Sequence, residues 1–199
     1  MEINEAIKSE ILKEFMTDDY LNYDNLINIK NRFNQNTPKS IKLDAFLKID
    51  KYLILKNEIT NLKFKRDYTP DSHSYSHSVI GNKFNNLIIS KEFKTFISFI
   101  IGKSIKKFDV NSILLKHKDY TLLSDEKIEP YFEINFFFTE KWDEEFGGYF
   151  SYINDEELIR ILPSGNSLTL VYLDGIKSFI KYININSNGN KNYLVSLNF

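Results

Sequence analysis

The second half of the chain is built from short, aromatic-rich segments that are separated by turn residues. Val, Ile, Tyr and Phe favour the pleated surface of a sheet, whereas Gly, Pro, Asn and Asp favour the turns between strands. Short strands at this spacing are typical of a β-sandwich or β-barrel. We therefore predict strands at residues 107–115, 131–138, 149–153, 158–162, 167–173, 179–185 and 193–199.

The chain has a different character before about residue 104, because apolar residues there recur at helical spacing. The predicted strands of this half are residues 41–46 and 62–68, and residues 71–78 are predicted to be a polar loop. Helices that precede a run of strands indicate an α+β, mainly β fold, with helices packed on one face of the sheets. The predicted helices are residues 6–15, 20–33, 47–59 and 91–103.

Composition narrows the class of protein. A chain of 199 residues with 42% hydrophobic content can bury a core as one domain, or one domain plus an appendage. The net charge of −1 gives no electrostatic reason to expect a nucleic-acid partner. The chain has no cysteine, which excludes disulfides and thiolate chemistry. No segment reads as a leader or a membrane span, so we expect a cytoplasmic protein without membrane contact.

His117 and Asp119 are the first candidates for chemistry. They stand two residues apart at the end of an apolar stretch, and residues i and i+2 of a strand point to the same face. Such a pair supplies two parts of the 2-His-1-carboxylate triad that holds non-haem Fe(II). The third ligand must come from elsewhere in the chain.

Further motifs follow His117-Lys118-Asp119 in a fixed order. They are residues 136–142 (FFFTEKW), 147–150 (GGYF), 163–168 (PSGNSL) and 197–199 (LNF). This order resembles the prolyl 4-hydroxylase-like branch of the Fe(II)/2-oxoglutarate oxygenases, with its H-x-D, LYLN-x-x-W, GG-x-L, P-x-x-N-x-L and GWF-like motifs. The resemblance covers roughly residues 41–199 and implies a double-stranded β-helix, or jelly roll, with N-terminal supporting helices. Residues 1–40 are then a helical N-terminal extension.

The resemblance implies Fe(II) and 2-oxoglutarate as cofactors, and it also exposes two departures. The family's second metal His begins the strand after the P-x-x-N strand, where this chain has Ser178, a poorer ligand than imidazole. The family grips 2-oxoglutarate with an Arg, less often a Lys, near the start of the last strand. Lys191 is the candidate there, as a point charge without the fork of Arg, and Asn192 cannot do this work.

Other residues have a functional and a structural interpretation. His73 and His77 share one face and either supply a missing ligand or belong to a solvated loop. Glu133 and Asn135 share one face of their strand and line either a pocket or the solvent side of a sheet. Trp142 is expected to be a packing residue, and the pair Gly147–Gly148 is expected to permit positive φ at a tight strand entry.

The sequence therefore supports two hypotheses for the function. One is a dioxygenase that hydroxylates a C–H bond, typically of a prolyl residue in a protein substrate, with His117 and Asp119 as its catalytic iron ligands and Lys191 holding the co-substrate. The alternative is a catalytically inactive jelly roll that acts as a binding or assembly module. Retention of the H-x-D favours the first function, and loss of the second His and of the usual Arg favours the second.

Overall fold

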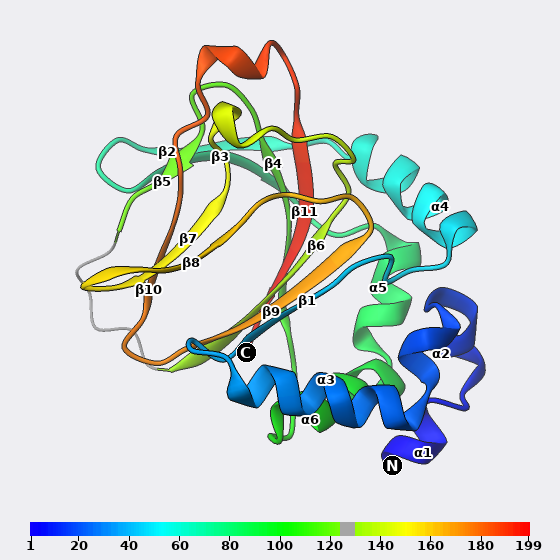
Figure 1. Ribbon diagram of the computed structural model, residues 1–199. Coiled ribbons are helices and arrows are strands. Elements are labelled where there is room, and N and C mark those ends of the chain that lie inside the picture. Colours follow the sequence, from blue (N-terminus) through cyan, green and yellow to red (C-terminus); the bar gives the residue numbers. More distant parts are fainter. Residues whose placement is uncertain (124–129) are drawn as a thin grey trace.

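The computed structural model describes residues 1–123 and 130–199 of the chain. Helices occupy the N-terminal part and strands the C-terminal part, as Figure 1 shows. The helices are α1 (Ile3–Ala6), α2 (Glu10–Phe15), η1 (Asp18–Leu21), α3 (Tyr23–Gln35), α4 (Ile49–Thr60), α5 (Asn82–Ile89), α6 (Lys91–Ile101), η2 (Glu144–Phe146) and η3 (Ile185–Ser187). Among the residues described, no helix combines the length and the apolar character needed to cross a bilayer.

The strands form two antiparallel sheets that face each other. The larger sheet has the order β1-β9-β6-β11-β4-β3-β2, with β5 paired to β3, and the smaller sheet has the order β10-β7-β8. The strands are β1 (Ser40–Leu43), β2 (Lys65–Thr69), β3 (His73–Ser78), β4 (Asp109–Leu115), β5 (Tyr120–Thr121), β6 (Tyr131–Phe137), β7 (Phe150–Asn154), β8 (Glu156–Ile161), β9 (Ser167–Leu173), β10 (Lys177–Ile180) and β11 (Asn192–Asn198). This jelly-roll-like arrangement with supporting helices confirms the predicted α+β, mainly β fold.

The central strand β6 shows why the two faces of the larger sheet differ. Phe132, Ile134 and Phe136 alternate along it and join the core under the helices, together with Phe93 and Phe96 of α6. The intervening residues of β6 point between the two sheets, where Phe137 packs in a second core. Successive side chains of a strand point to opposite faces, so β6 contributes alternate residues to the two cores.

The second core lies between the sheets and is smaller and more polar than the first. Its buried apolar residues are Leu115, Phe137, Phe150, Tyr152, Ile161, Val171, Leu173, Ile180, Ile183 and Leu194. Buried polar side chains share this space, and they form the candidate site described below.

Several boundaries differ from the prediction for clear physical reasons. Residues 71–78, predicted to be a polar loop, contain strand β3, because the small side chains of Ser74 and Ser76 fit the buried face between β2 and β4. The helix predicted at 6–15 is broken into α1 and α2, since Ser9 caps the second helix by accepting a hydrogen bond from Leu12 N at 3.4 Å. Helix α5 was not predicted, and β10 is shorter than the predicted strand 179–185.

Helices α1, α2 and α3 do not stand apart from the rest. Leu12, Leu26 and Phe33 belong to the same core cluster as α6 and the outer face of the larger sheet. The boundary at residue 40 therefore stays a prediction, and in the structure the N-terminal helices share the main core.

Candidate functional site

Asp119 lies in a tight turn between β4 and β5 and is fully buried. Its Oδ1 forms an ion pair with Arg66 of β2, and its Oδ2 accepts a hydrogen bond from Lys116 N at 2.8 Å. Lys118 has φ of +74°, so residues 117–119 turn and do not extend as a strand. The prediction that His117 and Asp119 share a strand face is therefore wrong, because a left-handed residue separates them.

His117 has neighbours that differ from those of Asp119. Its Nδ1 is buried and has no hydrogen-bond partner among the described residues. Its ring instead lies edge-on to Tyr182, with the ring centroids 6.4 Å apart. The imidazole thus has an aromatic neighbour, whereas the carboxylate of Asp119 is held by a cation and a backbone amide.

Ser178 lies in β10, away from this turn. It faces Tyr152 of β7 in the strand register and shares a hydrogen bond with the Tyr131 hydroxyl. The residue whose backbone pairs with Asp119 is Ile183, since Ile183 N donates to Asp119 O and Lys118 N donates to Ile183 O, both at 2.9 Å. The structure therefore does not bring Ser178 to His117 and Asp119. Within the described part of the chain, no three His, Asp or Glu side chains are grouped so that they could hold a metal ion.

The candidate co-substrate ligand Lys191 immediately precedes β11, and the first residue of that strand is Asn192. Lys191 is exposed, and its carbonyl accepts a hydrogen bond from the Thr139 hydroxyl at 3.2 Å. Asn192 is fully buried on the inner face, opposite Leu115, and neither of its side-chain polar atoms has a partner in the described residues. The position that points between the sheets is thus an amide and not a cation.

Glu133 is the centre of the polar cluster between the sheets. Its Oε1 accepts hydrogen bonds from the Tyr152 hydroxyl and from Asn135 Nδ2, each at 2.6 Å. Burial raises the pKa of the Glu133 carboxyl, and the two hydrogen bonds oppose that rise. Burial, and then the charge of Glu133, raises the pKa of the Tyr131 and Tyr152 hydroxyls. Of the two interpretations of Glu133 and Asn135, the structure supports an inward, buried face and rejects the solvent side of a sheet.

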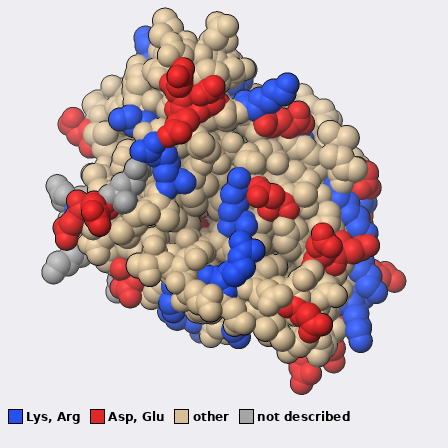
Figure 2. All heavy atoms as spheres, in the orientation of Figure 1, with Lys and Arg blue, Asp and Glu red and all other residues tan. Residues whose placement is uncertain are grey.

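Three buried oxygens without a partner in the described residues lie on the same sheet face as this carboxyl group. Asn135 Oδ1, Thr169 Oγ1 and Asn198 Oδ1 are buried without a hydrogen-bond partner among the described residues. Thr169 lies opposite Asn135 in the register, and Asn198 lies opposite Glu133, so all four belong to one patch of the inner face. Figure 2 shows the molecular surface hollowed between the two sheets. Buried acceptors without donors indicate a place where a donor from outside the chain fits.

His73 and His77 lie on the same face of β3, as their spacing predicts. His73 Nε2 is 3.1 Å from Asp67 Oδ1, and the hydrogen bond to His73 is the main reason that the pKa of the Asp67 carboxyl is lowered. His77 lies opposite Lys65 in the register. These residues form a polar sheet edge, and the metal role considered for the two histidines stays a prediction.

Trp142 and the glycine pair have the structural roles that the sequence predicts. Trp142 Nε1 donates a hydrogen bond to Gly147 O at 2.7 Å, and the ring packs against the core between the sheets. Gly147 and Gly148 have φ of +75° and +67°. A Cβ at Gly147 would lie 2.0 Å from Tyr182 O, so the chain passes too close to that carbonyl for any side chain.

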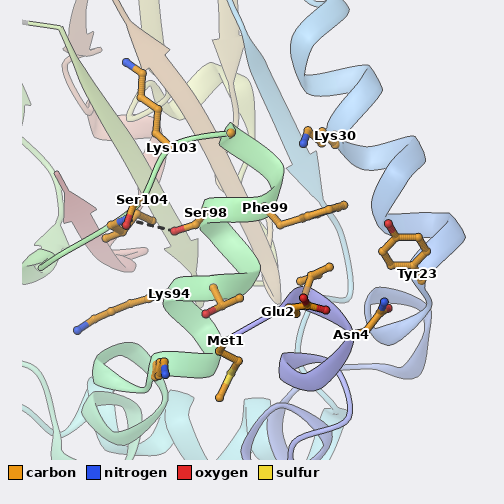
Figure 3. A pocket seen from close by; sticks show the side chains of 15 residues that line it. Met1, Glu2, Asn4, Tyr23, Lys30, Lys94, Ser98, Phe99, Lys103 and Ser104 are labelled. Carbon is orange, nitrogen blue, oxygen red and sulfur yellow. Dashed lines mark hydrogen bonds between the residues drawn. The ribbon is translucent and has the colours of Figure 1, made fainter.

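A groove of about 740 Å³ on the helical side is separate from this cluster. Figure 3 shows it between α1, α3 and α6, with Lys30, Lys94 and Lys103 around Ser98 and Phe99. The Lys30 ammonium lies 4.7 Å from the centroid of the Phe99 ring. None of the residues predicted as metal or co-substrate ligands lines this groove.

Comparison with known proteins identifies the family. Residues 74–199 match the family described as "Oxoglutarate and iron-dependent oxygenase degradation C-term". The chain belongs to this family. Among curated relatives, prolyl 3-hydroxylase OGFOD1 of Mus musculus is 42% identical over 72 residues, and that of Xenopus laevis is 38% identical over 77 residues. These matches cover 33% and 35% of this chain but only 13% and 15% of the relatives.

Solved structures extend the likeness to the whole fold. A prolyl hydroxylase from Trichoplax adhaerens, in complex with a hypoxia inducible factor peptide fragment, has a TM-score of 0.67 at 13% identity and covers 86% of this chain and 87% of its own. A Pseudomonas putida prolyl-4-hydroxylase has a TM-score of 0.64 at 9% identity and covers 86% and 96%. The predicted membership of the prolyl 4-hydroxylase-like branch of the 2-oxoglutarate oxygenases is confirmed, and the chain is a 2-oxoglutarate dioxygenase-like protein.

Proposed function

We propose that this chain is a non-catalytic jelly-roll module that binds a protein partner, built on the fold of a prolyl hydroxylase. The observation that carries the proposal is the pairing of Asp119 with Arg66. A carboxylate that is buried in an ion pair and bonded to Lys116 N has both oxygens engaged, and removing it from Arg66 to ligate a metal would leave a cation without its counter-ion.

The donor set does not fit Fe(II). The non-haem iron centre of these oxygenases needs two imidazoles and a carboxylate on one side of the metal. Among the described residues, the ring of His117 lies beside that of Tyr182. Ser178 lies in β10, where its hydroxyl is hydrogen-bonded to Tyr131 of β6. We therefore derive no reaction step through iron.

The interior does not fit 2-oxoglutarate either. A dicarboxylate needs an inward cation, and Arg provides the best match for a carboxylate. Asn192 takes the inward position at the start of β11, and Lys191 is exposed. A dianion placed there would meet a neutral amide where the family has a cation, which disfavours binding.

Prolyl hydroxylation by this chain is the competing function, and similarity to OGFOD1 favours it. That similarity covers a small share of the relatives, so it does not carry their whole activity to this chain. Both functions involve a protein partner, which for the Trichoplax adhaerens enzyme is a peptide. The two functions differ in whether iron and 2-oxoglutarate bind.

Anaerobic titration with Fe(II), with and without 2-oxoglutarate, separates them. We expect neither the visible charge-transfer band of a chelated iron complex nor a rise in melting temperature. The Pseudomonas putida prolyl-4-hydroxylase run in parallel supplies the positive control. A band that disappears in His117→Ala would overturn the proposal and establish an iron centre.

A further inference from the structure

The space between the two sheets has the chemistry of a cation site. It contains the carboxyl group of Glu133 and three buried oxygens without a partner in the described residues. The amide oxygens of Asn135 and Asn198 accept hydrogen bonds, and the Thr169 hydroxyl can accept or donate one. Residues opposite each other in a ladder have Cβ atoms about 5 Å apart, so these groups lie side by side on one face of the larger sheet. Carboxylate and neutral oxygens together favour a positively charged hydrogen-bond donor.

Residues 1–123 and 130–199 supply no cationic donor that acts on the Glu133 carboxyl. Burial raises the pKa of the Glu133 carboxyl, the hydrogen bonds from Tyr152 and Asn135 oppose that rise, and no cationic side chain of the described residues contributes. Lys42, which lies opposite Thr169 at the edge of the larger sheet, has its ammonium 3.1 Å from Asp44 Oδ1. Burial without a counter-ion favours the neutral carboxyl group of Glu133, and a bound cation would favour its ionised form.

Aromatic rings and access complete the site. Tyr131 and Tyr152 lie beside Glu133, and the negative faces of aromatic rings attract ammonium groups. Glu133 is buried but keeps 8% of its surface exposed, so it is not completely closed off from solvent. The hollow between the sheets in Figure 2 is the route by which they enter.

We propose that the space between the two sheets binds an alkyl ammonium group, with the carboxylate of Glu133 as its counter-ion. A lysine side chain of a partner protein and a small free amine carry the same group. The proposal rests on the proposed function, in which the interior binds neither iron nor 2-oxoglutarate. It assigns to the jelly-roll interior a ligand of the opposite charge to the family's co-substrate.

The test is an NMR titration that follows the ring signals of Tyr131 and Tyr152. The probes are butylammonium chloride and Nα-acetyl-lysine methylamide, in an amine-free phosphate buffer. We expect saturable shifts of both tyrosines with both probes. Binding of the lysine derivative at least tenfold more tightly than butylammonium identifies a partner's lysine as the ligand, and the reverse order identifies a free amine.

Two variants separate binding from folding. Glu133→Gln keeps the shape of the side chain and should weaken binding at least tenfold, whereas Glu140→Gln, a surface carboxylate that pairs with Lys56, should leave it unchanged. Thr169→Val removes an acceptor that has no partner in the described residues, so it should leave stability intact and weaken binding severalfold.

The proposed ammonium site would be overturned if neither probe shifted the tyrosine signals. It would also be overturned if wild type and Glu133→Gln bound the probes equally well. Binding of CaCl2 or MgCl2 in place of the amines would overturn it too. The iron titration is a separate measurement. A silent iron titration with no amine binding rejects only the ammonium site, whereas an iron band that needs His117 rejects the proposed function.

Discussion

The side-chain amide of Asn166 pairs with the backbone of Leu47 in both directions. Leu47 N donates to Asn166 Oδ1 at 2.9 Å, and Asn166 Nδ2 donates to Leu47 O at 2.8 Å. Phe46 N also donates to Asn166 O at 2.9 Å. Asn166 has φ of +56°, a conformation that Asn tolerates better than most residues. Through these hydrogen bonds, Asn166 links the residues just before β9 to the segment between β1 and α4.

We expect Asn166→Ala to lower the free energy of unfolding by about 2–4 kcal/mol. The variant loses both side-chain hydrogen bonds, and Ala tolerates positive φ less well than Asn does. Urea denaturation measures the loss. Asn166→Gly relieves the backbone strain but lacks the amide, so it should lose less than the Ala variant and still be less stable than wild type. Equal stability of the Gly variant and wild type would show that the amide pairing contributes nothing.

Gly147 and Gly175 offer a matched pair for a second prediction. Both have positive φ, but a Cβ at Gly147 would lie 2.0 Å from Tyr182 O, whereas a Cβ at Gly175 meets nothing within 4 Å. We expect Gly175→Ala to lose about 1 kcal/mol from backbone strain alone. Gly147→Ala should lose at least about 3 kcal/mol or fail to fold, since the neighbouring backbone must move. Thermal melts of both variants test this, and equal losses would contradict the close approach.

These two sites show which parts of the fold the sequence predicts well. Local chemistry determines the glycine pair and the turns, and the alternation of β6 and β9 determines their strands, so those predictions are confirmed. Strand β3 was predicted as a loop because its polar alternation resembles a solvated segment. Only its insertion between β2 and β4, a long-range pairing, makes it a strand.

Asp119 and His117 provide a third prediction, which separates a structural from a ligand role. Asp119→Ala should lower the free energy of unfolding by about 3 kcal/mol, because it leaves Arg66 and Lys116 N without their acceptor. His117→Ala should lose no more than about 1 kcal/mol, since the Nδ1 of His117 has no hydrogen-bond partner in the described part of the chain. Chemical denaturation in metal-free buffer gives both values. Equal losses that appear only when Fe(II) is present would instead indicate a shared metal site.

The candidate site was harder to predict than the fold. The spacing argument for His117 and Asp119 assumes a strand, but the left-handed conformation of Lys118 puts these residues in a turn. The local sequence does not predict a non-glycine residue at positive φ. The alternation at Glu133 and Asn135 was visible in the sequence. Whether that face meets solvent or the second sheet depends on the pairing of strands far apart in the chain, so burial of Glu133 could be read only from the structure.

The raised pKa of Glu133 predicts how stability changes with pH. Above the unfolded-state pKa of about 4.3, the unfolded chain has released this proton while the folded protein still holds it. The folded state then binds more protons than the unfolded state, so the free energy of unfolding falls as pH rises, by up to about 1.4 kcal/mol per pH unit. The fall ends once Glu133 ionises in the folded protein.

Glu133→Gln cannot release this proton, so its stability lacks this contribution to the pH dependence. We expect the stability of the variant relative to wild type to be constant below pH 4 and to increase between pH 4.5 and 7, measured by urea denaturation in amine-free buffers. Asp67 and Glu140, whose lowered carboxyl pKa values act in the opposite direction, are common to both proteins and cancel in the difference. A difference that stays flat across this range would mean that Glu133 ionises in the folded protein at its ordinary pKa, and that the interior carries a counter-charge for it.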